Sequence, residues 1–143
     1  MDFFPNKELD SKINKMKLEH FALNVEEPVA MADWYKEHLG LQIVRQMEES
    51  PFTTFLRDDS NTILIEIYKN AATEVPNYKD MNPLLVHLAF VSEDPSEEKN
   101  RLIKAGATAV SDHQLNDGSH LVMMRDPWGL AIQFCKRGNA MIY

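Results

Sequence analysis

Apolar and polar residues alternate along this chain in two stretches that follow the same order of elements. A period of two residues predicts a strand, and a period of about 3.6 residues predicts a helix. The first stretch predicts a strand, a helix and three strands, at residues 18–25, 29–39, 41–44, 52–57 and 62–68. The second stretch repeats this order at residues 84–91, 96–105, 107–110, 120–125 and 130–135. The sequence therefore predicts two βαβββ modules.

Prolines and glycines mark the ends of both predicted helices. Pro28 and Pro95 stand where a proline fits the first helical turn, and acidic residues precede each of them. Gly40 and Gly106 follow the two helices, where a glycine adopts positive φ without strain. These residues support the helix boundaries independently of the periodicity.

The two modules are in register with each other, which indicates an internal duplication. Three pairs of corresponding residues are each 67 positions apart: His20 and His87, Pro28 and Pro95, and Glu66 and Gln133. Neither half would bury much surface alone, so we expect both to pack into one domain. We expect an N-terminal arm at residues 1–16, a domain at residues 17–137 and a C-terminal tail at residues 138–143. Within the domain, module 1 covers about residues 17–70, a linker residues 71–83 and module 2 about residues 84–137.

Strand parity places one metal-capable side chain on a single face of four predicted strands, since alternate residues share a face. These side chains are His20, Glu66, His87 and Gln133. The opposite faces carry bulky apolar residues suited to packing under a helix, and three of the four have an alanine two positions away, which leaves space around them. If the first and last strands of each module are adjacent, His20 meets Glu66 and His87 meets Gln133. A pseudo-twofold axis would then join the two pairs in one metal site.

The segments around these residues resemble motifs of the vicinal oxygen chelate superfamily, which contains glyoxalases, bleomycin resistance proteins and dioxygenases. They are Leu18-Glu19-His20, Leu39-Gly40-Leu41, Ile65-Glu66-Ile67, Val86-His87-Leu88 and Asp126-Pro127-Trp128-Gly129 with Ile132-Gln133. The resemblance runs from about Lys17 to Lys136 and is closest to glyoxalase I (lactoylglutathione lyase). It implies an α+β fold in which two tandem βαβββ modules form a single domain, with curved mixed sheets around a central cavity. It also implies a homodimer.

The same resemblance implies that His20, Glu66, His87 and Gln133 are metal ligands, but Gln133 departs from the glyoxalase I pattern. That position normally holds a second glutamate, which transfers a proton. A glutamine binds a metal through its amide oxygen but cannot act as a base, so Glu66 would be the only catalytic base. Two histidines, one glutamate and one glutamine are also the ligand inventory of the methylmalonyl-CoA epimerase branch, with Glu and Gln in exchanged halves. Mixed N and O ligands suit Zn²⁺, Ni²⁺, Co²⁺ or Mn²⁺, and the sequence does not choose among them.

We therefore expect a metal-dependent lyase or isomerase that transfers a proton next to a carbonyl of a small-molecule substrate. Phe55, Tyr68 and His120 are candidates to line the substrate pocket. Any of four arginines is a candidate for an acidic substrate group: Arg45, Arg57, Arg125 and Arg137. Two alternatives stay open. One is a ligand-sequestering protein of the bleomycin-resistance kind, and the less favoured one is a non-heme iron dioxygenase, whose carboxylate ligand would stand at position 133.

Charge and composition narrow the class of partner. The net charge is −7 over 143 residues, which argues against a nucleic-acid or anionic-membrane surface. Cys135 is the single cysteine, so no disulfide forms within the chain. The sequence shows no secretory signal and no apolar run of about 20 residues that would cross a bilayer. These features lead us to expect a cytoplasmic protein.

Overall fold

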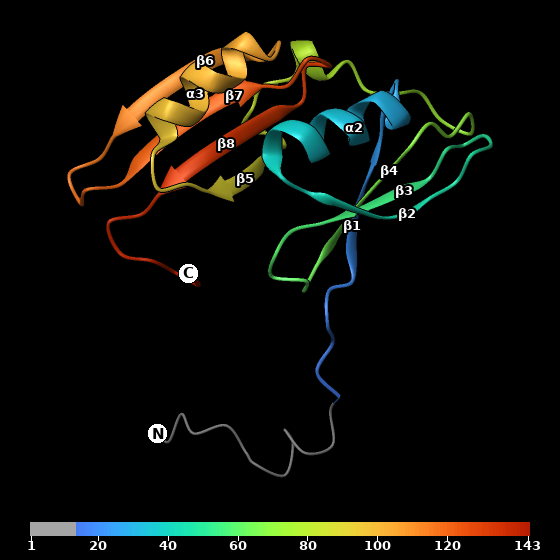
Figure 1. Cartoon of the computed structure of the whole chain (residues 1–143), viewed down its shortest axis with the longest axis horizontal. Coiled ribbons are helices and arrows are strands. Elements are labelled where there is room, and N and C mark those ends of the chain that lie inside the picture. The colour runs from blue at the N-terminus through green and yellow to red at the C-terminus, as the bar shows by residue number, and fades with distance from the viewer. Residues whose placement is uncertain (1–13) are drawn as a thin grey trace.

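The computed structural model describes residues 14–143, so most of the expected N-terminal arm lies outside the described residues. Two four-stranded sheets stand side by side, each with one helix, and the first belongs to module 1 and the second to module 2. Figure 1 shows module 1 on the right, module 2 on the left and the C-terminal end below module 2. No helix among residues 14–143 is long and apolar enough to span a membrane.

Module 1 forms a mixed sheet in the order β1-β4-β3-β2. Its elements are β1 (His20–Asn24), α2 (Pro28–Leu39), β2 (Gln42–Gln46), β3 (Thr54–Arg57) and β4 (Leu64–Tyr68). β1 and β4 pair in parallel, whereas β2 with β3 and β3 with β4 pair antiparallel. The first strand of the module therefore lies beside its last strand and forms one edge of the sheet.

Module 2 repeats this topology in the order β5-β8-β7-β6. Its elements are β5 (Leu88–Val91), α3 (Pro95–Lys104), β6 (Thr108–Gln114), β7 (His120–Arg125) and β8 (Ala131–Lys136). β5 pairs in parallel with β8, as β1 does with β4. The predicted fold of two tandem βαβββ modules is confirmed, and so is the adjacency of first and last strands.

One boundary differs from the sequence prediction in a way that matters for the site. The strand expected over residues 84–91 begins only at Leu88, because a turn occupies the residues before it. In this turn Leu85 N–H donates to the Asn82 carbonyl, and Leu84 N–H donates to the Asn82 side chain at 2.9 Å. His87 consequently lies just ahead of β5. A short 3-10 helix, η1 (Tyr78–Asp80), also stands in the linker, where no element was predicted.

Helix α2 joins the two modules through one continuous core. The side chains of Trp34 and Tyr35 are buried, as expected for core residues. Trp34 Nε1 donates to the Ala105 carbonyl at 2.9 Å, and Tyr35 Oη donates to Asp126 Oδ2 at 2.7 Å. Both acceptors belong to module 2. These bonds fix one module against the other within the chain.

Candidate functional site

The sheet faces that do not pack against the helices carry the candidate ligands. Leu23 of β1 and Ile67 of β4 are buried in the core, as are Ile132 and Phe134 of β8. Side chains alternate along a strand, so the opposite faces present His20 and Glu66 in module 1 and Gln133 in module 2. We call these the open faces of the two sheets.

His20 and Glu66 are in contact on the open face of module 1. His20 Nε2 lies 3.2 Å from Glu66 Oε2, and the other ring nitrogen, Nδ1, lies 3.0 Å from Glu19 Oε1. The Glu66 side chain is only 15% exposed. The parallel pairing of β1 and β4 sets this geometry, because Glu66 is registered with Ala22, whose small side chain leaves the space that the imidazole fills.

Module 2 carries a second imidazole and a second oxygen donor at the corresponding positions of its sequence. Gln133 is registered with Ala89, two residues beyond His87, just as Glu66 is registered with Ala22, two residues beyond His20. His87 Nδ1 lies 2.9 Å from the Pro83 carbonyl, which accepts only from a protonated ring nitrogen. That bond selects the tautomer whose Nε2 carries a free lone pair, the form that a metal requires.

Gln133 is held by its neighbour on β8. The Cys135 thiol donates to Gln133 Oε1 at 3.3 Å, and burial raises the pKa of this thiol. The cysteine therefore stays protonated as a donor and orients the amide rather than acting as a nucleophile. An amide oxygen held in this way keeps a second lone pair for another partner.

The structure brings together two of the four candidate ligands within one chain. His20 and Glu66 meet in the sheet of module 1, whereas His87 and Gln133 belong to the separate sheet of module 2. Among residues 14–143, no group of three His, Cys, Asp or Glu side chains is placed to hold a metal ion. Each module thus carries one imidazole and one side-chain oxygen, and the donor chemistry of these four residues fits a divalent cation.

The three expected pocket residues fall on two different faces. Phe55 is registered with Glu66 and meets the His20 ring edge to face, with 5.8 Å between ring centroids. Tyr68 shares the face of Glu66 on β4. His120, however, shares the face of the buried Val122, beneath α3, and its Nε2 lies 2.6 Å from Asp112 Oδ1. His120 and Val122 are two residues apart on β7, so both side chains lie on the face of the sheet that packs against α3. His120 therefore lies on the opposite face from Gln133.

Sequence reasoning did not identify the groups that orient the two histidines. Glu19 directly precedes His20 within the Leu18-Glu19-His20 motif, and nothing in that motif predicts its contact with the imidazole. The Pro83 carbonyl lies in a turn that stands where the sequence predicted the start of a strand. The Asn82-Pro83 pair, a common turn signal, was the available indication of that turn. The contact between Tyr35 and Asp126 spans 91 residues and carries no local signal.

Comparison with known proteins identifies one matching family and many solved structures with a similar fold. The family described as the Glyoxalase/Bleomycin resistance protein/Dioxygenase superfamily matches residues 17–134. No curated protein matches the chain.

Solved structures with the same fold come from several bacteria at low sequence identity. TnmS3, an antibiotic binding protein from Streptomyces sp. CB03234, is 14% identical with a TM-score of 0.68, covering 87% of this chain and 98% of that one. A superfamily member from Sphaerobacter thermophilus is 14% identical with a TM-score of 0.66, covering 85% and 97%. A lactoylglutathione lyase from Agrobacterium tumefaciens is 18% identical with a TM-score of 0.61, covering 85% and 93%. At such identity these structures show the fold alone.

Proposed function

The chain belongs to the glyoxalase/bleomycin resistance protein/dioxygenase superfamily, and from this premise we propose a metal-dependent lyase or isomerase of the glyoxalase I kind. The reaction is transfer of a proton at a carbon next to a carbonyl in a small substrate. The observation that carries the proposal is the contact between His20 Nε2 and Glu66 Oε2 at 3.2 Å on an open sheet face. This contact places an imidazole nitrogen, which can bind a metal ion, beside a carboxylate that can accept a proton.

His20, Glu66, His87 and Gln133 are the residues that would hold the ion. A divalent cation held there would supply Lewis acidity at the substrate carbonyl, which would make the proton on the neighbouring carbon more acidic. Glu66 takes the proton from that carbon and returns it, because it is the only carboxylate in the set and Gln133 cannot accept a proton. Phe55 packs edge to face against the His20 ring. Glu19 and the Pro83 carbonyl keep the two imidazoles oriented.

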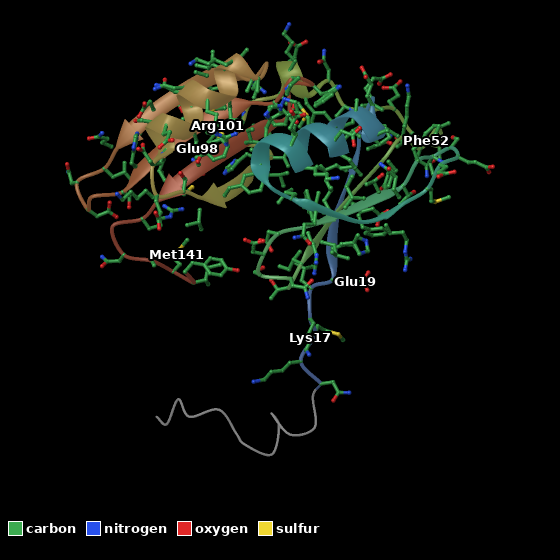
Figure 2. All side chains as sticks on the ribbon, in the orientation of Figure 1. Lys17, Glu19, Phe52, Glu98, Arg101 and Met141 are labelled. Atoms are coloured by element: carbon green, nitrogen blue, oxygen red, sulfur yellow. The ribbon has the colours of Figure 1, made fainter. Side chains whose placement is uncertain are left out.

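The complete site requires a second copy of the chain, so we propose a homodimer with two shared sites. β1 and β5 are free edges of their sheets, and exposed apolar side chains surround them: Leu18, Phe21, Leu84, Leu85 and Val91. A groove of about 780 Å³ runs along the edge of β5, bordered by the end of α2, the loop between β3 and β4, the C-terminal tail, and Glu98 and Arg101 of α3 (Figure 2). Unpaired edges with apolar surroundings are surfaces that a second chain covers. His87 and Gln133 of the second copy would then face His20 and Glu66.

The assignment of Glu66 as the base is tested with Glu66→Gln, which keeps an oxygen ligand and removes the base. We expect turnover of an α-keto aldehyde–thiol adduct to fall at least about 100-fold, in the range that loss of a general base produces. Metal content per chain, measured on protein purified without chelators, should stay at the wild-type value. Retained turnover with retained metal would contradict the assignment.

The second candidate function is sequestration of a small ligand without catalysis. Gln133 favours it, because it removes one of the two carboxylates that a glyoxalase I site normally offers. TnmS3, which shares the fold, is described as an antibiotic binding protein. The metal measurement on the wild type separates the two functions. A native protein that takes up no divalent ion contradicts the enzyme and supports sequestration.

A further inference from the structure

A β-bulge turns one arginine toward the open face of module 1. β2 and β3 pair with Ile43 opposite Leu56 and Arg45 opposite Phe55, so the register shifts at Val44. Without the extra residue, Arg45 would face the helix side, where Leu56 is fully buried. The bulge instead places Arg45 on the face that carries Phe55. Bulges commonly re-aim a side chain next to a functional site.

Arg45 stands in one cross-strand row with the proposed base. Phe55 is registered with Arg45 on one side and with Glu66 on the other. The backbones of Arg45 and Glu66 are therefore two strand spacings apart, about 10 Å. The Arg45 side chain is exposed, and a guanidinium on this strand can reach over Phe55 toward the space beside Glu66.

A second arginine strengthens the positive charge of the same face. Arg57 is registered with Leu64, which is registered with His20. Its guanidinium donates to the Gln42 side chain at 3.0 Å and to the Asn61 side chain at 2.9 Å, so neutral acceptors hold it in place.

No carboxylate within the described residues neutralises these two arginines. The ion pairs of this part of the chain involve other cations, and Arg45 has neither an ion-pair partner nor an acceptor for its side chain there. This is notable in a chain of net charge −7 with 22 acidic residues. A fixed guanidinium beside a free one is an arrangement that binds a carboxylate strongly.

The duplicated module shows that the arginine is specific to module 1. The bulge recurs in β6, where the register shifts between Ala109 and Ser111. Ser111 is registered with Met123, and Met123 with Gln133, so Ser111 occupies the place that Arg45 has in module 1. At this position, module 2 thus presents a neutral residue and module 1 a cation.

We propose that Arg45, supported by Arg57 on the neighbouring strand β3, binds a carboxylate of the substrate. This carboxylate is several bonds away from the carbonyl group, next to which the reacting carbon loses its proton. The proposed substrate class is therefore a small carbonyl compound with an anionic end. The inference rests on the proposed function, which identifies the carbonyl end of the substrate as the end that reacts. It assigns Arg45 as the residue that selects charged over neutral substrates.

The test compares two probes that differ only in charge, 5-oxohexanoate and 5-oxohexanamide. Their dissociation constants are measured by calorimetry with the wild type, Arg45→Gln, Arg45→Lys and a control, Lys104→Gln. Lys104 is exposed in the last turn of α3 and does not line the groove along β5, so its loss removes one positive charge from a different surface. Thermal unfolding of each variant checks that the fold is unchanged, as expected for substitutions at an exposed residue.

We expect the wild type and Lys104→Gln to bind the carboxylate roughly tenfold more tightly than the amide. Arg45→Gln should bind both probes equally, and Arg45→Lys should keep part of the preference because it keeps the charge. A preference that survives in Arg45→Gln, one that disappears in Lys104→Gln, or a wild type that binds neither probe would overturn the inference. The readout needs neither turnover nor metal, so a protein that shows the preference but takes up no divalent ion would contradict the proposed function alone.

Discussion

Asp126 is the residue that connects the two modules most directly. Its carboxyl is buried in the turn between β7 and β8, where it accepts from Tyr35 Oη and from the backbone N–H groups of Trp128 and Leu130. Burial raises the pKa of this carboxyl from 3.8 to about 6, and the hydrogen bonds oppose the shift. The same burial and the neighbouring carboxyl raise the pKa of the Tyr35 hydroxyl, which therefore remains a donor.

This raised pKa makes stability depend on pH in a defined direction. The unfolded chain releases the Asp126 proton near pH 3.8 and the folded chain near pH 6. The protonated carboxyl therefore stabilises the folded state fully below about pH 4, and this contribution is lost as pH rises through about 6. The shift corresponds to about 3 kcal/mol. Urea unfolding between about pH 4 and pH 7 should show the wild type losing about that much free energy of unfolding relative to Asp126→Asn. Parallel pH curves for the two proteins would refute this account of Asp126.

At the scale of elements, the periodicity of the sequence predicted both α-helices and every strand of the described chain, because both modules alternate strongly on one buried face. It did not predict the 3-10 helix η1. The pairing of β1 with β4 was a condition of the predicted site, because only adjacent strands bring His20 and Glu66 together, and the structure shows this pairing. The periodicity failed at Asn82–His87, where apolar Leu84 and Leu85 continue the alternating pattern but remain exposed in a turn. The bulges in β2 and β6 were not predicted either, because a register shift depends on the partner strand. Arg45 therefore could not be distinguished from the other arginines.

The turn after β7 offers a sharp test of how the linker element η1 packs. Gly129 has φ +93°, and a Cβ there would lie 2.7 Å from the N and Cα atoms of Lys79 in η1. Gly129→Ala should therefore lower the free energy of unfolding by about 3 kcal/mol, through backbone strain and displacement of η1. Gly40→Ala is the control, because Gly40 has φ +72° but open space around it, and only the strain of about 1 kcal/mol applies. Equal losses in the two variants, measured by chemical denaturation, would show that η1 does not pack tightly there.

At the scale of the whole molecule, the duplication explains why the proposed site is divided between the modules. Each module repeats the parallel pair of first and last strands and carries one imidazole and one side-chain oxygen at corresponding positions of its sequence. The sequence identified these four residues as candidate metal ligands. The arrangement of the two modules, however, depends on long-range contacts of α2, such as that of Tyr35 with Asp126, which no local pattern encodes. Those contacts hold the modules side by side with β1 and β5 as free edges. In the proposed dimer, the second copy would supply the two donors that each half of the metal site lacks.

The most direct test of a shared metal site is to combine two variants that each lack one histidine. His20→Ala and His87→Ala alone should bind little divalent metal, because each loses a ligand from every site. Co-refolded in equal amounts, they form mixed dimers in which one site lacks both histidines and the other keeps both. Metal content should then recover to roughly a quarter of the wild-type value, since about half of the dimers are mixed and each has one intact site. A mixture as free of metal as the separate variants, beside a wild type that retains its metal, would contradict the shared site.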